Sequence, residues 1–185
     1  HPLEWKLSAA DTAAYLAGKK TLASGDYDGK ARLDIAPLVS AGFGSWYLST
    51  PGEMRFDGTL SATVNNQLRL DAPKFSTLDD RASVNFTAAA LQLGSYAPTA
   101  APASSAIVGS TASAVFSARD IGISGNFSWN GFATSAFNSS GEIHFDSTAN
   151  SAPNRVGGRN FSGQMTASGK VEFAAARLSP STYSD

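Results

Sequence analysis

Short stretches in which apolar and polar residues alternate follow one another along most of the chain after Gly18. Alternation with a period of two places apolar side chains on one face of a β-strand and polar side chains on the other. The clearest of these stretches are residues 31–35, 54–56, 68–70, 84–86, 121–123, 127–129, 143–145 and 171–173. The pattern therefore predicts a mainly β protein whose strands each have one buried and one exposed face.

Residues typical of turns interrupt these stretches roughly every 8–12 residues. They include Pro51-Gly52, Asn65-Asn66, Asp79-Asp80, Asn130-Gly131 and Gly157-Gly158. Short strands separated by such turns are typical of all-β sandwiches and barrels. We therefore expect an antiparallel β-sandwich or barrel, and no internal repeat stands out in the sequence.

One short helix is expected at the N-terminus, packed against the sheet. Ser8 and Asp11 suit its first turn, because a serine hydroxyl can accept a backbone N–H there and a carboxylate suits the positive end of the helix dipole. Residues 9–17 are good helix formers, and Gly18 is placed to end the helix.

The chain is expected to form one β-rich binding domain over residues 1–178, with a flexible tail over residues 179–185. An Ala/Pro/Ser-rich stretch near residues 94–114 has little to bury and predicts a long exposed loop. We interpret it as a loop between two β-rich halves, because the second half alone lacks a balanced core.

Composition narrows the class of protein. Charged residues make up 16% of the chain, below the roughly 25% of average soluble domains, and Ser, Thr, Asn and Gly supply the polarity instead. This composition favours a secreted or cell-surface protein. A net charge of -1 with no basic stripe argues against nucleic-acid binding. No apolar run is long enough to span a bilayer, so membrane attachment is expected only through an anchor outside this chain.

Candidate chemistry is sparse, and the sequence predicts no enzyme. The chain has no cysteine and two histidines, His1 and His144. No serine nucleophile motif accompanies His144, which falls on the polar side of a predicted strand. Trp46 and Tyr47 follow two flexible glycines. They fit either a strand entering the core or a loop that grips a ligand.

Four separated pieces of the chain resemble the Htaa domain, which occurs in haem-uptake proteins on the surface of corynebacteria and related actinobacteria. The pieces are Leu3-Glu4-Trp5 leading to Tyr15 and Gly18; Asp28-Gly29; residues 52–58 followed by Leu68, Leu70 and Pro73; and Trp129-Asn130-Gly131 with Phe132 and Ala133. Their order and spacing carry the resemblance, which covers most of the chain up to about residue 135.

The resemblance implies a β-rich fold that holds haem at a short helix, with Tyr15 as the phenolate ligand of ferric iron. Trp46 and Tyr47 would wall the porphyrin. Two positions depart from the family pattern. Thr59 stands where the family has a histidine that helps to hold the phenolate, and Asp11 replaces a serine one helical turn before Tyr15. A carboxylate at that distance disfavours the phenolate.

Three functions stay open from the sequence. The first is a haem-binding or haem-relay module, with haem or another surface protein as partner. The second is a structural module of the cell envelope that has lost haem ligation and assembles with copies of itself. The third is a carbohydrate- or lipid-binding module that uses Trp46 and Tyr47 as stacking surfaces.

Overall fold

The computed structural model describes residues 33–96, 108–146, 148–150 and 160–180. Contacts between Cα atoms divide the chain into two units, His1–Asp34 and Ile35–Asp185, and the fold below is that of the second unit. The expected N-terminal helix lies outside the described residues.

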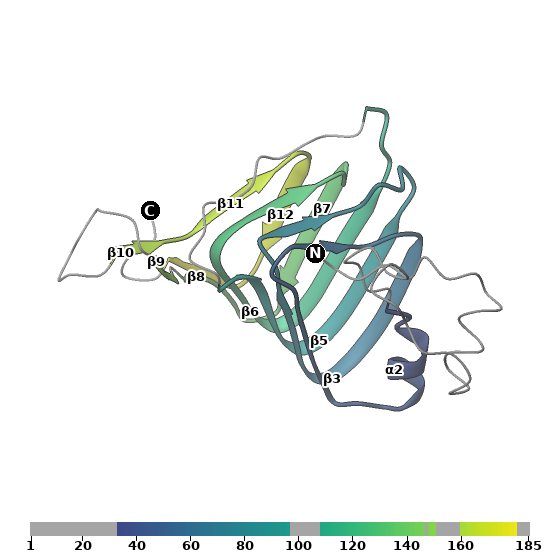
Figure 1. The fold of residues 1–185 in the computed structure, drawn as a ribbon. Coiled ribbons are helices and arrows are strands. Elements are labelled where there is room, and N and C mark those ends of the chain that lie inside the picture. Colours follow the sequence, from purple (N-terminus) through teal and green to yellow (C-terminus); the bar gives the residue numbers. More distant parts are fainter. Residues whose placement is uncertain (1–32, 97–107, 147, 151–159, 181–185) are drawn as a thin grey trace, which may run out of the picture. The chain divides into compact units, whose positions relative to one another are not determined.

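The described part of the second unit is almost entirely β-strand (Figure 1). Its elements are α2 (Ala36–Ser40), β1 (Ser45–Ser49), β2 (Glu53–Arg55), β3 (Thr59–Asp71), β4 (Lys74–Ser76), β5 (Ser83–Ser95), β6 (Ser113–Asn130), β7 (Thr134–Ser139), β8 (Glu142–Asp146), β9 (Thr148–Asn150), β10 (Asn160–Ser162), β11 (Gln164–Ala167), β12 (Lys170–Ala174) and β13 (Arg177–Pro180).

The main sheet is parallel, and the expectation of an antiparallel sandwich or barrel is wrong. Among the described residues, only the separate pair β9–β10 is antiparallel, whereas every pairing of the main sheet is parallel. Trp46 of β1 pairs with Leu68 of β3, and Leu68 pairs with Leu91 of β5. All three strands run in the same direction. The chain therefore returns to the same place one strand further along after each coil, as in a β-solenoid.

The coils together build three strips of sheet, which we call faces I, II and III. Face I contains residues 59–64, 83–88, 113–118, 134–139 and 170–174. Face II contains residues 45–49, 67–71, 90–95, 120–125, 142–146 and 177–180. Face III contains residues 53–55, 74–76, 126–130 and 164–167.

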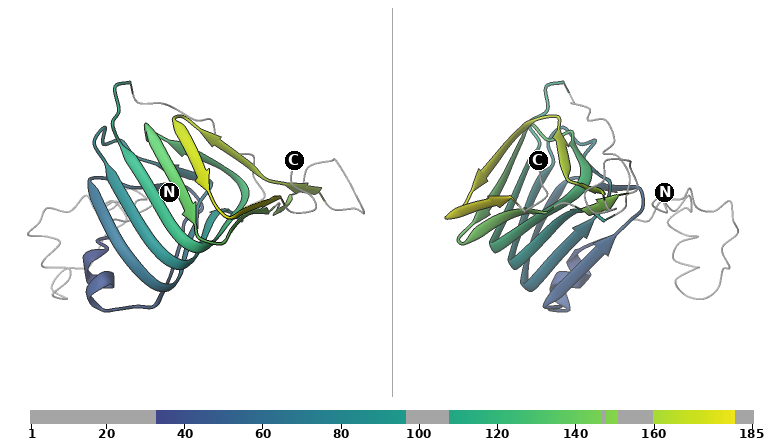
Figure 2. Two further views of the ribbon diagram at one scale, coloured as in Figure 1. Left: turned by 180° about the vertical axis from the view of Figure 1, so that it is seen from behind. Right: turned by 90° about the vertical axis from the view of Figure 1, so that its left-hand side faces the viewer.

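The longest strands bend from one face into the next, which gives the sheet its strong, half-barrel-like curvature. β3 and β5 each run through faces I and II, and β6 runs through all three. In Figure 1 and in both views of Figure 2 these strands stay side by side around the bend.

The core fills the inside of the coils, because alternate residues of each strand point inward. Phe86, Phe116, Phe137 and Phe173 occupy equivalent positions of face I in successive coils. Their rings stack with centroid separations of 5.8, 5.3 and 5.4 Å. Aromatic rings at this separation stabilise the stack beyond the area that they bury, so the core ties each coil to its neighbours.

The turn residues form the corners of the coils and not hairpins. Asn65 and Asn66 lie at the irregularity in β3 where it passes from face I to face II. Gly58 and Gly131 have φ angles of 74° and 83° and lie at two corners between face III and face I. The corners of a solenoid and the turns of a hairpin need the same residue types. The sequence therefore predicts where strands end, but not whether the next strand runs parallel or antiparallel.

Strands border the Ala/Pro/Ser-rich stretch on both sides, because β5 continues to Ser95 and β6 begins at Ser113. Residues 97–107 of this stretch lie outside the described residues. The coil that contains it has no described strand on face III, and β4 pairs directly with β6. Of the expected tail, Ser179 and Pro180 belong to β13, and residues 181–185 lie outside the described residues.

Candidate functional site

The outer side of face II carries a column of polar and aromatic side chains from successive coils. Tyr47, Arg69 and Gln92 occupy equivalent positions in β1, β3 and β5. Each follows an inward-pointing neighbour, such as Trp46 or Leu68, so the alternation of the strand directs it outward. In-register parallel strands lie about 4.8 Å apart, which brings these side chains into contact.

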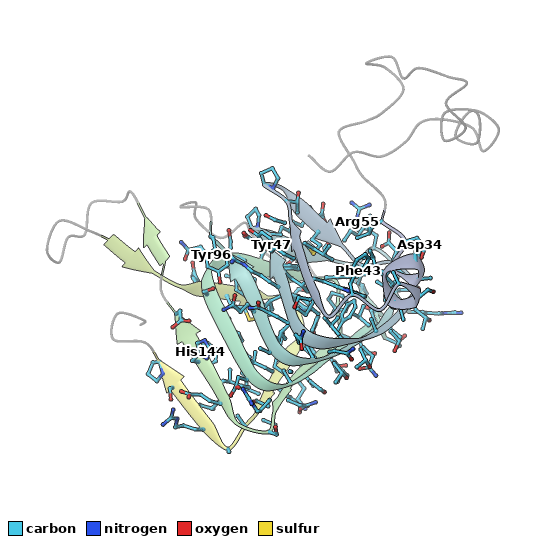
Figure 3. All side chains as sticks on the ribbon, turned by 90° about the horizontal axis from the view of Figure 1, so that it is seen from below. Asp34, Phe43, Tyr47, Arg55, Tyr96 and His144 are labelled. Atoms are coloured by element: carbon cyan, nitrogen blue, oxygen red, sulfur yellow. The ribbon has the colours of Figure 1, made fainter. Side chains whose placement is uncertain are left out.

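Arg69 is held between two tyrosine rings. Its guanidinium carbon lies 4.6 Å from the centroid of the Tyr47 ring and 4.1 Å from that of Tyr96. Tyr96 immediately follows β5, and Figure 3 shows Tyr47 and Tyr96 on the same side of the sheet. Tyr47 is 59% exposed and Tyr96 is 38% exposed. We call Tyr47, Arg69, Asp71 and Tyr96 the tyrosine–arginine cluster.

Asp71 fixes the two tyrosines. The Tyr47 hydroxyl donates to Asp71 Oδ2 at 3.1 Å, and the backbone N–H of Tyr96 donates to Oδ1 at 3.2 Å. The Ser49 hydroxyl adds a longer bond of 3.4 Å to Oδ2. Because one carboxylate accepts from the Tyr47 hydroxyl and from the Tyr96 backbone, it holds the Tyr47 ring and the chain at Tyr96 in place before any ligand arrives.

The buried Nε of Arg69 has no hydrogen-bond partner among the described residues. A guanidinium that packs on aromatic rings through its planar face keeps its N–H donors in the plane, where an acceptor can meet them edge-on. A buried donor without a partner costs about 1–3 kcal/mol. Because this Nε is buried, a ligand would recover that energy only by opening the cluster far enough to reach it.

The outer column continues with Gly122 and His144 beyond Gln92. A Cβ atom at Gly122 would lie 2.7 Å from His144 Nε2, so the imidazole leans across the space that the glycine leaves. His144 Nε2 also lies 3.3 Å from Asp146 Oδ2. The column therefore offers donors and acceptors over several coils, at right angles to the strands.

The residues predicted from the sequence do not gather at one place. Trp46 points into the core and is 6% exposed, and its Nε1 has no partner among the described residues. Tyr47 belongs to the cluster on face II, whereas the exposed Thr59 begins β3 on face I. Tyr15 lies outside the described residues. Trp46, Tyr47 and Thr59 therefore lie in three different parts of the described fold: the core, the outer side of face II and face I.

Sequence reasoning identified Tyr47 but missed Arg69, Asp71 and Tyr96. The three come together with Tyr47 only because one coil separates β1 from β3 and another separates β3 from β5. The signal that could have revealed them is the repetition of Trp46-x-Leu48 as Leu68-x-Leu70 and Leu91-x-Leu93.

One carboxylate on face III has a perturbed pKa. Burial alone would raise the pKa of Glu53, but the Ser76 hydroxyl and the Lys74 ammonium outweigh burial and hold it below its ordinary value. Lys74 Nζ lies 3.3 Å from Glu53 Oε1. Both partners belong to β4, so Glu53 joins β2 to β4.

The part of the chain that the structure describes contains no group of three or more His, Cys, Asp or Glu side chains that could hold a metal ion. None of its helices is both long enough and apolar enough to cross a membrane.

No model of a known protein family matches the chain, and neither does any curated protein or solved structure. The resemblance to the Htaa domain therefore stays a prediction from the motifs quoted above.

Proposed function

We propose that this chain is a non-enzymatic binding module that binds a carboxylate-bearing saccharide on face II, through the tyrosine–arginine cluster. The observation that supports the proposal is the preorganised guanidinium of Arg69, stacked between Tyr47 and Tyr96 with a buried donor unpaired within the described residues.

A saccharide suits this cluster because each of its surfaces has a partner there. Exposed tyrosine rings stack on the apolar C–H face of a sugar and offer a hydroxyl at the rim. The in-plane edge of Arg69 matches a carboxylate, which accepts two parallel N–H bonds from a guanidinium. Gln92 can bond sugar hydroxyls with its amide. The column on face II runs across the coils, so an extended chain of sugars fits it better than a single sugar.

The test is binding of an oligouronate by isothermal titration calorimetry, with the neutral oligosaccharide of the same linkage as comparison. Arg69→Lys keeps the charge but loses the planar fork and its stacking. A charged bidentate contact contributes about 1.5–3 kcal/mol, so we expect affinity to fall roughly tenfold or more. Tyr47→Ala should weaken binding as well.

The matched control is Arg119→Lys, because Arg119 is exposed and pairs with Asp120 away from the cluster. This variant should bind as the unchanged protein does. Equal affinity for the neutral oligosaccharide would rule out carboxylate recognition, and unchanged affinity in both Arg69→Lys and Tyr47→Ala would place the site elsewhere.

Haem binding is the second candidate function, and the Htaa resemblance around Tyr15 is the observation that favours it. Titration of the protein with ferric haem should then give a saturable one-to-one absorption spectrum of the tyrosinate type. Tyr15→Phe should abolish that spectrum. A weak spectrum that the substitution leaves unchanged would exclude Tyr15 as the iron ligand.

A further inference from the structure

The outer side of face I carries a regular array of small side chains, separate from the tyrosine–arginine cluster on face II. In its first four strands, residues 59–64, 83–88, 113–118 and 134–139, the register is continuous. Outward residues therefore form three columns across the coils. The columns are Thr59, Ser83, Ser113 and Thr134; Ser61, Asn85, Val115 and Ala136; and Thr63, Thr87, Ser117 and Asn138.

All twelve side chains of this array are uncharged, none is aromatic, and each is exposed or half-buried. The first charged outward residues on face I are Lys170 and Glu172, on its fifth strand β12. Face II differs, because its outer side carries Arg69, Asp71 and Asp120 as well as the cluster tyrosines. The absence of charge is thus a property of the first four strands of face I and not of the whole solenoid.

The composition of the array argues against the common classes of partner. Protein interfaces are enriched in aromatic residues, Met and Arg and depleted in Ser and Ala. Four strands of six residues cover roughly 400 Å² at the usual strand spacings, about half of what a standard interface buries on each partner. Nucleic acid needs basic side chains, and sugar stacking needs aromatic rings.

The geometry of the array matches an ordered lattice of water. Neighbouring columns repeat about every 6.6 Å along a strand, and neighbouring coils about every 4.8 Å, distances of the same order as the repeats between water molecules in ice. The threonines and Val115 are β-branched and stiff at χ1, so their hydroxyl and methyl groups keep fixed positions. Charged side chains, which would orient water against the lattice, are absent from the array.

We propose that face I binds the surface of ice. Holding a bridging water in place costs up to about 2 kcal/mol in solution, but a water molecule in a crystal is already fixed. On ice, the free energies of many weak hydrogen bonds and methyl contacts therefore add up to stable binding. In liquid water, the cost of fixing each water molecule offsets them. This surface is independent of the tyrosine–arginine cluster on face II.

The test measures how much protein a slowly growing ice crystal takes up, together with the thermal hysteresis of the solution. Thr87→Lys puts a charge in the third column. We expect the unchanged protein to enter the ice, and Thr87→Lys to be taken up at least tenfold less and to lose hysteresis. The matched control is Ala90→Lys, which puts the same charge on the same strand β5 but on face II, and it should behave as the unchanged protein does.

Thermal unfolding followed by circular dichroism verifies that both variants keep the fold. Exclusion of the unchanged protein from ice would overturn the proposal, and so would uptake of Thr87→Lys equal to that of Ala90→Lys. Concentration-dependent self-association that Thr87→Lys abolishes would also overturn it, because face I would then be a protein interface. None of these results depends on oligouronate binding, so the two proposals fail separately.

Discussion

At the scale of single residues, the absence of a side chain decides how closely two coils approach. Gly94 in β5 lies beside Ser124 in β6, with φ at 154°. A Cβ atom added there would lie 1.9 Å from the backbone oxygen of Ser124. Because a backbone oxygen held in a sheet cannot move aside as a side chain can, Gly94 is needed for β5 and β6 to pair at this point.

Gly94→Ala should therefore lower the free energy of unfolding by about 2–4 kcal/mol, because it adds overpacking to a strained backbone conformation. Urea unfolding followed by tryptophan fluorescence measures the loss. The control is Gly44→Ala, whose Cβ would meet the side-chain amide of Asn66 at 2.8 Å. That amide can rotate away, so the control should change stability by no more than about 1 kcal/mol. Equal losses in the two variants would contradict this explanation.

At the scale of secondary-structure elements, the sequence predicts the strands and their buried faces but not how they pair. Alternation at Leu68-x-Leu70 and Ile121-x-Ile123 identifies inward positions correctly, since the alternation is a property of one strand. Pairing direction depends on where the chain returns. Phe86, Phe116 and Phe137 are equivalent in the core yet unequally spaced along the chain, because one coil contains the Ala/Pro/Ser-rich stretch. The structural repeat of the coils is therefore not visible as a regular spacing in the sequence.

The same limit applies to the candidate site. Tyr47 is recognisable in the sequence as an aromatic residue beside flexible glycines. Arg69 and Tyr96 have no local feature that marks them, because their contact with Tyr47 arises from the stacking of three coils. Likewise, the columns of face I consist of ordinary Ser, Thr and Asn residues, which become an array only through the register between strands.

At the scale of the whole second unit, the two ends of the solenoid differ. At one end, Ile35 and Leu38 of the α2 region pack against the core, and α2 contacts β3. At the other end, among the described strands, β12 pairs only with β7 and β13 only with β8. A pocket of about 400 Å³ opens there, lined among others by Phe145, Val171 and Phe173. Among the described residues, the aromatic stack of face I thus ends at Phe173, beside this pocket.

This asymmetry predicts that the coil containing β12 and β13 opens before the rest. In a solenoid each coil is stabilised by its own contacts and by those with its neighbours, and the last coil has one described neighbour. Hydrogen exchange should be about tenfold or more faster in peptides covering residues 170–180 than in those covering residues 83–95, since local opening costs less than global unfolding.

Phe173→Ala tests whether the aromatic stack holds this coil. It removes the last ring of the stack and leaves the ring pair of Phe86 and Phe116 in place. The variant should speed exchange over residues 170–180 and leave residues 83–95 nearly unchanged. If both segments exchanged at one common rate, and Phe173→Ala accelerated them equally, the unit would unfold as a single cooperative structure. Separate rates would instead show that each coil is stabilised largely by its neighbours, and that the coil of β12 and β13 opens with only its described neighbour, β7 and β8, to hold it.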